Sequence, residues 1–195
     1  MHDLTAFVLA GGKSTRMGSD KAFLPWGEGT LLSHALKLAG TVAPKVQIVG
    51  DKERFAAFGN VVEDVYAERG PLGGIHAALS TTITPYNLML AVDLPLLEPR
   101  FLEYLLAQAR EAQAVVTVPL VAGGYQPLTA VYQNEFAGIA DQSLREGRNK
   151  IDPLFASVGT RVIQPEELTQ AGFSPEMFRN LNTPEDLRRA NLIRP

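Results

Sequence analysis

The sequence of 195 residues contains no cysteine and carries a net charge of only −3. Without cysteine, the chain can form neither disulfides nor thiolate metal sites, and it has no cysteine nucleophile. This absence agrees with a reducing compartment. No signal peptide and no apolar run of membrane-spanning length is visible, so we expect a cytoplasmic protein without membrane contacts. The slightly negative charge and ordinary apolar share (46%) argue against disorder and against general nucleic-acid binding.

Three common nucleotide and hydrolase motifs are also missing, although a glycine-rich stretch near the start partly resembles them. The Walker fingerprint needs a glycine five residues before the unit Gly12-Lys13-Ser14, and that position is Phe7. The dinucleotide pattern G-x-G-x-x-G does not occur. A G-x-S-x-G elbow around Ser14 is excluded because Arg16 occupies its last glycine position.

What the stretch at residues 9–21 does contain is typical of an anion site. It follows a short apolar run, residues 5–9, that is expected to be a buried strand. Paired glycines let the backbone approach a ligand closely with N–H groups turned toward it. Lys13, Arg16 and Lys21 add three cations within nine residues. We therefore favour a nucleoside triphosphate site over the alternative, a glycine turn with solvated basic residues.

Short strands and helices alternate along the whole chain, which predicts an α/β fold with a mostly parallel central sheet flanked by helices. The expected strands are residues 5–9, 46–49, 61–62, 88–92, 114–118, 128–132 and 160–163. The expected helices are residues 30–39, 52–58, 99–112 and 135–145, with another following the glycines at 70–74. We expect one domain over 1–195, with a nucleotide-binding half at about 1–95 and an acceptor-binding half at about 96–195.

Acidic residues follow two of the expected strands. Asp64 comes just after residues 61–62, and Asp93 comes directly after 88–92, the most apolar run of the chain. In parallel sheets, ligands bind at the carboxyl ends of strands. A carboxylate beside a buried strand needs a metal, a cation or backbone donors. Asp93 could instead cap the next helix, but Pro99 puts that boundary nearer Glu98, so we favour a metal at Asp93.

The segment LAGGKSTRMGSDK, residues 9–21, resembles the signature of the molybdenum cofactor guanylyltransferase family, which belongs to the Rossmann-like nucleotidyltransferases. Every fixed position of the family pattern L-A-G-G-x-S-x-R-M-G-x-D-K matches. Further family motifs are G-P-L-x-G at 70–74, D-x-P at 93–95 and N-x-N-T-P-E-[DE]-L at 180–187. The last motif is also an ordinary helix start, with Thr183 as N-cap and Pro184 first in the helix.

The resemblance covers nearly the whole chain and implies a single-domain Rossmann-like nucleotidyltransferase fold. It implies Mg²⁺-dependent transfer of GMP from GTP to the terminal phosphate of molybdopterin, with release of pyrophosphate and formation of molybdopterin guanine dinucleotide. GTP and molybdopterin are then the substrates. Upstream cofactor-synthesis proteins and acceptor molybdoenzymes are the expected protein partners.

The resemblance and the charge argument together predict the site residues. Arg16, Lys21 and Asp93 are expected to be catalytic, with Asp93 holding the metal. The nucleotide-binding residues are expected at Leu9, Ala10, Gly11, Gly12, Lys13, Lys21, Asp64 and Asp93. Further substrate contacts are expected at Gly74, Arg148, Asn180 and Asn182. The Gly11 and Gly12 amides would hold the phosphates in line while the cations polarise them.

Some alternatives stay open. Some family members carry asparagine just after the second strand, where this chain has Gly50 and Asp51, and Asp51 is the candidate substitute. Arg148 lies in a basic turn that is equally typical of solvated surface. The chain could use CTP in place of GTP, or a sugar or polyol phosphate as acceptor. A non-catalytic nucleotide-binding protein is a third possibility, against which Lys21 and Asp93 argue.

Overall fold

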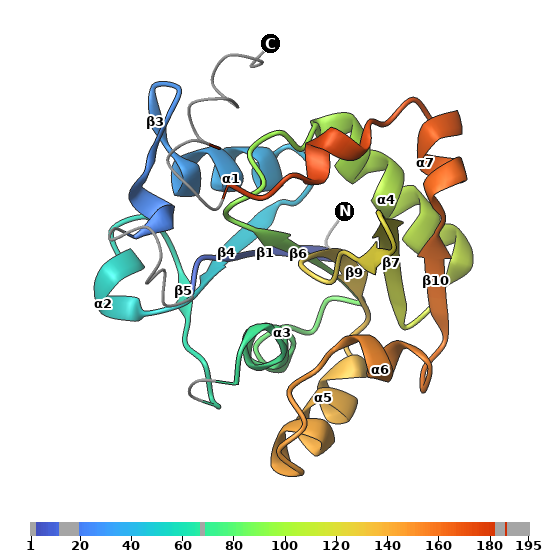
Figure 1. Ribbon diagram of the computed structural model, residues 1–195. Helices are drawn as coiled ribbons and strands as arrows, with labels where there is room; N and C mark the ends of the chain where they lie inside the picture. The colour runs from blue at the N-terminus through green and yellow to red at the C-terminus, as the bar shows by residue number, and fades with distance from the viewer. Residues whose placement is uncertain (1–2, 12–19, 67–68, 182–185, 187–195) are drawn as a thin grey trace.

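The computed structural model describes residues 3–11, 20–66, 69–181 and 186, and its centre is an eight-stranded mixed sheet with helices on both faces (Figure 1). The strand order is β10-β7-β9-β6-β1-β4-β5, with β8 paired to β7 outside this path. The strands are β1 (Leu4–Leu9), β4 (Lys45–Val49), β5 (Val61–Val62), β6 (Tyr86–Ala91), β7 (Val116–Val121), β8 (Gly124–Tyr125), β9 (Thr129–Tyr132) and β10 (Thr160–Ile163). Within this sheet, only β8 and β9 run antiparallel to their neighbours.

The centre of the sheet is buried on both sides because β1 and β6 carry apolar residues at successive positions. Every residue of β1 is buried, and β1 pairs in parallel with both β4 and β6. Since side chains alternate across a strand, Ala6 and Val8 enter one core and Phe7 and Leu9 the other. Two separate hydrophobic cores therefore form, one on each face of the sheet.

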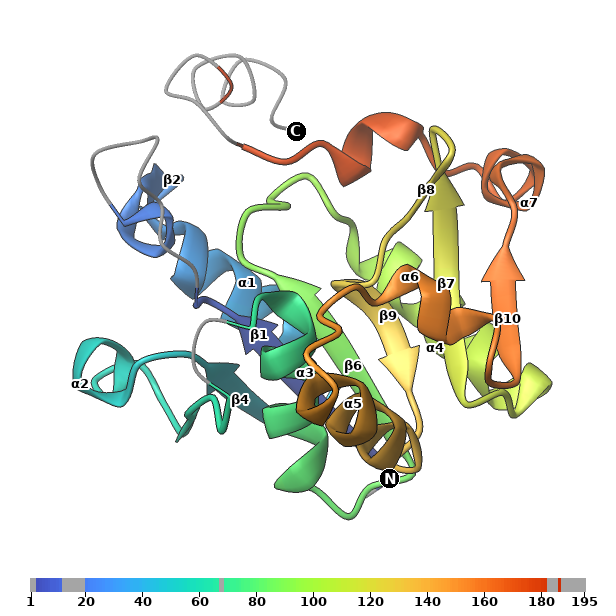
Figure 2. The same cartoon turned by 60° about the horizontal axis from the view of Figure 1, so that its bottom comes forward.

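Helices cover these two cores. The helices are α1 (Leu31–Gly40), α2 (Lys52–Phe55), α3 (Pro71–Ser80), α4 (Pro99–Ala112), α5 (Phe136–Arg145), α6 (Asp152–Phe155) and α7 (Pro165–Gln170). Buried residues of α1 and α4 belong to one core, and those of α3 and α5 to the other. Figure 2 shows α3 and α5 side by side on their face of the sheet. Among the described residues, no helix is long and apolar enough to cross a membrane.

The path of the chain reverses direction at the carboxyl ends of β1 and β6. From β1 the chain passes through α1 to β4 and on to β5, and it returns through α3 to β6 on the other side of β1. The connections leaving the carboxyl ends of β1 and β6 therefore head in opposite directions. Such a reversal point is where open α/β sheets bind their ligands.

The expected elements are confirmed wherever a long apolar pattern existed, and the differences lie in short elements. The start of α1 is as expected, because Thr30 and Ser33 form a reciprocal capping box. The expected strand at 114–118 instead spans Val116–Val121 and turns into β8 through Ala122 and Gly123. Both turn residues have positive φ (49° and 78°), as two-residue hairpin turns require.

Other short elements carried too little periodicity to be found. These are the hairpin of β2 (Pro25–Trp26) and β3 (Gly29–Thr30), the helices α6 and α7, and the 3₁₀ helices η1 (Lys21–Phe23) and η2 (Pro175–Phe178). The expected helix at 52–58 ends at Phe55. The helix start expected at Thr183 and Pro184 lies outside the described residues, and the division into two halves stays a prediction.

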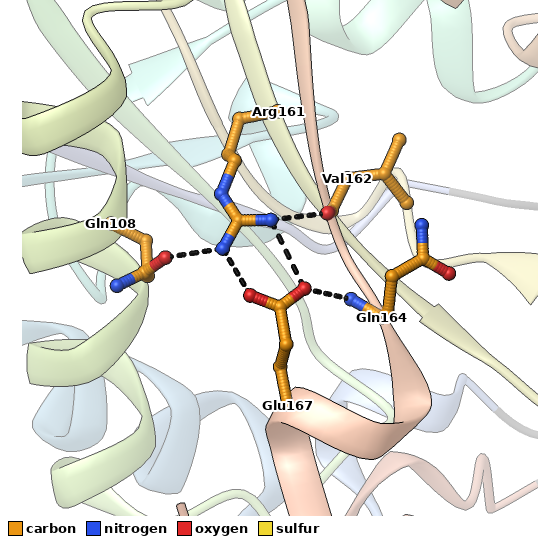
Figure 3. Close-up of polar contacts among 5 residues, drawn as sticks. All are labelled: Gln108, Arg161, Val162, Gln164 and Glu167. Carbon is orange, nitrogen blue, oxygen red and sulfur yellow. Dashed lines mark hydrogen bonds and ion pairs between the residues drawn. The ribbon is translucent and has the colours of Figure 1, made fainter.

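An arginine fork joins three elements at the β10 edge of the sheet (Figure 3). Arg161 of β10 donates to both carboxylate oxygens of Glu167 in α7, to the Gln108 side-chain oxygen of α4 at 2.6 Å and to the Val162 carbonyl. The Gln164 amide also donates to Glu167, at 2.9 Å. These hydrogen bonds, first those from Arg161, lower the pKa of the Glu167 carboxyl below its ordinary value.

We predict that Glu167→Gln lowers the thermal stability near neutral pH. Because the folded-state pKa of Glu167 is depressed, its contribution is fully present above the ordinary value of 4.5 and is lost as pH falls through the folded value. Discounted for partial exposure, the loss should be about 1 kcal/mol. Thermal unfolding of both proteins along a pH series measures it, and the gap should narrow with acidification.

Glu166→Gln is the matched control, because Glu166 is the exposed neighbour in the same helical turn. It should leave the unfolding temperature close to that of wild type. Equal stability of the Glu167 and Glu166 variants would mean that the fork contributes nothing to the docking of α7.

Candidate functional site

The ends of four parallel strands are joined by backbone hydrogen bonds that continue past the sheet. The amides of Ala10 and Gly11 both donate to the Val49 carbonyl, at 3.0 and 3.1 Å. The Val92 amide donates to the Leu9 carbonyl at 3.3 Å, and the Gly50 amide donates to Val62 at 3.0 Å. The first residues after β1, β4 and β6 therefore form one continuous edge, which β5 extends.

Glycines let the segments at this edge approach one another closely. A Cβ atom on Gly50 would lie 2.8 Å from Cε2 of Phe55 and 3.3 Å from the Gly11 amide nitrogen. A Cβ atom on Gly74 would lie 3.2 Å from Leu9 Cδ2 and 3.6 Å from Asp64 Oδ1. Gly50 therefore lets α2 pack under the end of β4, and Gly74 lets α3 reach the strand ends. Beside Asp64, Gly74 acts in this structure through its lack of a side chain.

The structure brings Lys21 and Asp93 together from positions 72 residues apart. The Lys21 ammonium lies 3.3 Å from Asp93 Oδ2, and the two side chains are 19% and 22% exposed. Asp93 follows β6, and its carbonyl accepts the Leu181 amide at 3.0 Å. It does not cap the next helix, because α4 begins at Pro99 with Glu98 as N-cap. The pair is partly buried yet open to a ligand.

Asp64 lies in the loop after β5. The residue is exposed, but partial desolvation of its carboxyl group raises its pKa above the ordinary value. The loop is fastened two residues later, where the Tyr66 hydroxyl donates to Asp141 Oδ1 of α5 at 2.6 Å. The Tyr66 ring also packs edge-on against His76 of α3, with centroids 5.3 Å apart. A carboxylate is thus held in a fixed loop beside the edge formed by β1 and β4.

The residues expected to contact the acceptor lie on two segments. Arg148 is exposed and pairs with Glu146, while its backbone is fixed by hydrogen bonds to Ser143 at 2.8 and 2.9 Å. Asn180 is exposed and directly precedes Leu181, whose amide binds the Asp93 carbonyl. The C-terminal motif therefore begins beside Asp93.

A pocket lies next to the basic turn that contains Arg148. It is open, has a volume of about 440 Å³ and lies between the start of α3 and the turn after α5. Its lining residues are Pro71, Asn149, Lys150, Ile151, Asp152 and Pro153. The lining carries one charge of each sign, from Lys150 and Asp152, and the first turn of α3 begins at Pro71.

Four of the expected site residues, Gly12, Lys13, Arg16 and Asn182, lie outside the described residues. Asp51 has a structural task, since its Oδ1 accepts the Glu53 and Arg54 amides at 2.9 and 3.3 Å and caps α2. The Gly11 amide donates within the sheet edge, so in this structure it is not turned toward a ligand.

Sequence reasoning missed three contributors to the site: Gly50, Leu181 and the Tyr66–Asp141 hydrogen bond. The position of Gly50 after a strand was a usable signal, because glycines there often mark a close backbone approach. Leu181 lay inside a recognised motif between two asparagines. Nothing in the sequence connects Tyr66 to Asp141, which are 75 residues apart.

The donor set fits Mg²⁺ bound together with a substrate. Among the residues that the structure describes, no group of three or more histidine, cysteine or acidic side chains could enclose a metal ion. Mg²⁺ usually binds one or two carboxylates and completes its shell with water and substrate phosphates. Asp93 can supply such a carboxylate at the strand edge, so the protein alone is not expected to hold the ion firmly.

Comparison with known proteins gives a consistent result over the length of the chain. Residues 6–160 match the family model described as MobA-like NTP transferase domain. The chain is 33% identical over 195 residues to a probable molybdenum cofactor guanylyltransferase from Pelotomaculum thermopropionicum, covering 99% of this chain and 94% of that protein. It is 30% identical to one from Carboxydothermus hydrogenoformans, covering 97% and 95%.

A solved structure agrees with the sequence relatives. The fold is similar to the crystal structure of molybdopterin-guanine dinucleotide biosynthesis protein A from Archaeoglobus fulgidus, with a TM-score of 0.84. The two chains are 25% identical, and the match covers 97% of each. The expected Rossmann-like nucleotidyltransferase fold is thereby confirmed.

The packing around Gly50 generates a prediction about the site. Gly50→Ala would push a methyl group into the Phe55 ring, so we expect a loss of about 1–3 kcal/mol in the free energy of unfolding. Gly138→Ala is the control, because a Cβ atom on this exposed glycine of α5 would have no neighbouring atom within 4 Å. Chemical denaturation should show Gly138→Ala to be neutral or more stable by about 0.5–1 kcal/mol. Wild-type stability of Gly50→Ala would contradict the close approach.

Proposed function

The chain belongs to the MobA-like NTP transferase domain family, and from that membership we propose that it is a molybdenum cofactor guanylyltransferase. It transfers GMP from GTP to the terminal phosphate of molybdopterin, forming molybdopterin guanine dinucleotide and pyrophosphate. Nearly full-length similarity to proteins with this name supports the reaction. The structural observation that carries the mechanism is the Lys21–Asp93 pair at the reversal point of the sheet.

Charge neutralisation is the main task of the site. A nucleoside triphosphate carries about four negative charges near neutral pH. Lys21, Lys13 and Arg16 are the cations proposed to face it, and Asp93 is proposed to hold Mg²⁺. When bound, the ion neutralises phosphate charge and stabilises the departing pyrophosphate. Asp93 would hold the metal, and Lys21 would donate to phosphate oxygens, where charge grows in the transition state.

The transfer itself needs no general base. An oxygen of the terminal molybdopterin phosphate forms the new bond to the α-phosphorus of GTP. The bond from that phosphorus to the bridging oxygen breaks, and pyrophosphate leaves with the electron pair. Because a terminal phosphate is already ionised near neutral pH, no proton has to be removed from the nucleophile. The role of the protein is then to align the two phosphates and to stabilise the leaving group.

The second substrate is proposed to bind between the C-terminal motif and the turn after α5. Support comes from the pocket that includes Lys150, from the neighbouring Arg148, and from Asn180 beside the backbone contact to Asp93. Gly74 and Asp64 would line the nucleotide side. Upstream cofactor-synthesis proteins and acceptor molybdoenzymes are proposed as partners that supply and receive the cofactor.

The nucleotide that the protein prefers distinguishes the proposed guanylyltransferase from the alternative functions. Pyrophosphate release with molybdopterin and Mg²⁺ should be compared for GTP, CTP, ATP and UTP. Turnover with GTP alone is the expected result. A preference for CTP would retain the fold and mechanism but assign a cytidylyltransferase. Nucleotide binding without turnover would point to a sugar or polyol phosphate acceptor, or to a binding protein.

We predict that Asp93→Ala abolishes Mg²⁺-dependent turnover, because it removes the carboxylate proposed to hold the metal. Glu98→Ala is the matched control, since this exposed acid lies five residues further along the same connection. Steady-state assays over a range of Mg²⁺ concentrations measure the effect. Full activity of Asp93→Ala would remove the metal assignment.

We predict separately that Lys21→Met lowers kcat at least about tenfold, given what single electrostatic groups contribute to transition states. Lys37→Met changes the same charge on the exposed face of α1 and should leave kcat unaltered. Initial rates at saturating GTP test the pair. If kcat of Lys21→Met matched wild type, Lys21 would have no part in catalysis.

A further inference from the structure

The 3₁₀ helix η1, which carries Lys21, is fastened to α2 by contacts that do not involve Asp93. Asp20 precedes η1, and its Oδ1 accepts the Ala22 amide at 3.2 Å, which caps the helix. Its other oxygen, Oδ2, pairs with the Arg54 guanidinium of α2. At the end of η1, Phe23 packs against Phe55 of α2 with ring centroids 5.7 Å apart.

Arg54 is itself held in place from several sides. Its guanidinium carbon lies 5.1 Å from the centre of the Phe55 ring, and its amide donates to Asp51, the N-cap of α2. Phe55 is fully buried beneath Gly50, so α2 is anchored to the end of β4. The pair formed by Asp20 and Arg54 therefore connects Lys21 to the rigid sheet edge.

We infer that Arg54 is a positioning residue for the proposed transfer reaction, acting through Asp20 to hold Lys21 opposite Asp93. This inference rests on the proposed function and deepens it. Arg54 lies outside all the family motifs found in the sequence, and its side chain contacts Asp20 and Phe55. Its contribution to the reaction is the placement of another cation.

Arg54 also compensates the negative charge of Asp20. Asp20 is an anion directly before Lys21, near the site of a ligand with about four negative charges. With Arg54 present, both carboxylate oxygens of Asp20 are hydrogen-bonded, and its charge is compensated. Without Arg54, this carboxylate would repel the triphosphate and could compete with Asp93 for Lys21. Loss of Arg54 therefore removes a tether and exposes a negative charge.

A double-mutant cycle of Arg54→Gln and Asp20→Asn tests this chain of action. Arg54→Gln should lower kcat about five- to tenfold with a smaller change in KM for GTP, because small displacements of a catalytic group are costly. Asp20→Asn should cost less, since asparagine still caps η1 and no anion is left behind. The double variant should match Asp20→Asn, so that the second substitution restores part of the activity lost in Arg54→Gln. Arg54→Lys should also restore part of it.

Arg110→Gln is the matched control. Arg110 is 40% exposed, as Arg54 is; it pairs with Asp3 at 3.2 Å and lies 5.9 Å from the Tyr86 ring centre. This pair is at the opposite end of β1, so its loss should leave kcat and KM unchanged. Comparable unfolding temperatures of the Arg54 and Arg110 variants would exclude a general loss of stability as the cause.

Two results would overturn the inference. One is wild-type kcat in Arg54→Gln. The other is a double variant that is worse than either single one, which would mean that Arg54 contacts the nucleotide directly. The wild-type protein is assayed first, because absence of turnover there contradicts the proposed function and not the tether. In that event, calorimetry measures the affinity of the same variants for GTP with Mg²⁺. The double variant is then expected to recover part of the affinity that Arg54→Gln loses.

Discussion

The Val49 carbonyl accepts two amides from the first residues after β1, and the positions of the other site groups depend on this contact. It keeps the ends of β1 and β4 together beyond the sheet, where glycines at positions 50 and 74 leave room for close approach. The end of β6 joins the same edge through the Leu9 carbonyl. The joined carboxyl ends of these strands thus form a rigid backbone that positions charged side chains from distant segments.

Four carboxylates near this edge have different tasks, because each has different neighbours. Asp51 caps α2, Asp20 joins η1 to Arg54, and Asp64 is partly desolvated in a fixed loop. Asp93 faces Lys21 without being committed to a helix cap. A single pair of opposite charges at a ligand site can be separated when a polyanion and its metal arrive. The surrounding contacts of Asp20 and Asp51 hold the backbone in place around that pair.

Much of the fold could be predicted because long apolar patterns such as residues 88–92 have one stable solution, a strand buried on both faces. The position of Asp93 after such a strand could be predicted, and so could its need for a partner, but the Lys21 ammonium was not foreseen as that partner. The contacts between Asp20 and Arg54 and between Tyr66 and Asp141 could not be predicted, because the segments they join come together only after folding. Gly11 was expected to turn its amide toward a ligand, yet that amide completes the strand edge. Short elements such as α7 depend on caps and on the Arg161 fork, which leave little periodic signal.

The most direct test of the account is a crystal structure of the protein with GTP and Mn²⁺, in which anomalous scattering locates the metal. We predict that the metal would be held by the Asp93 carboxylate, with the Lys21 ammonium moved from Asp93 to a phosphate oxygen. We also predict that the pair of Asp20 and Arg54 stays unchanged. A nucleotide bound away from the carboxyl ends of β1 and β6, or a metal that leaves Asp93 paired only with Lys21, would contradict the central claim.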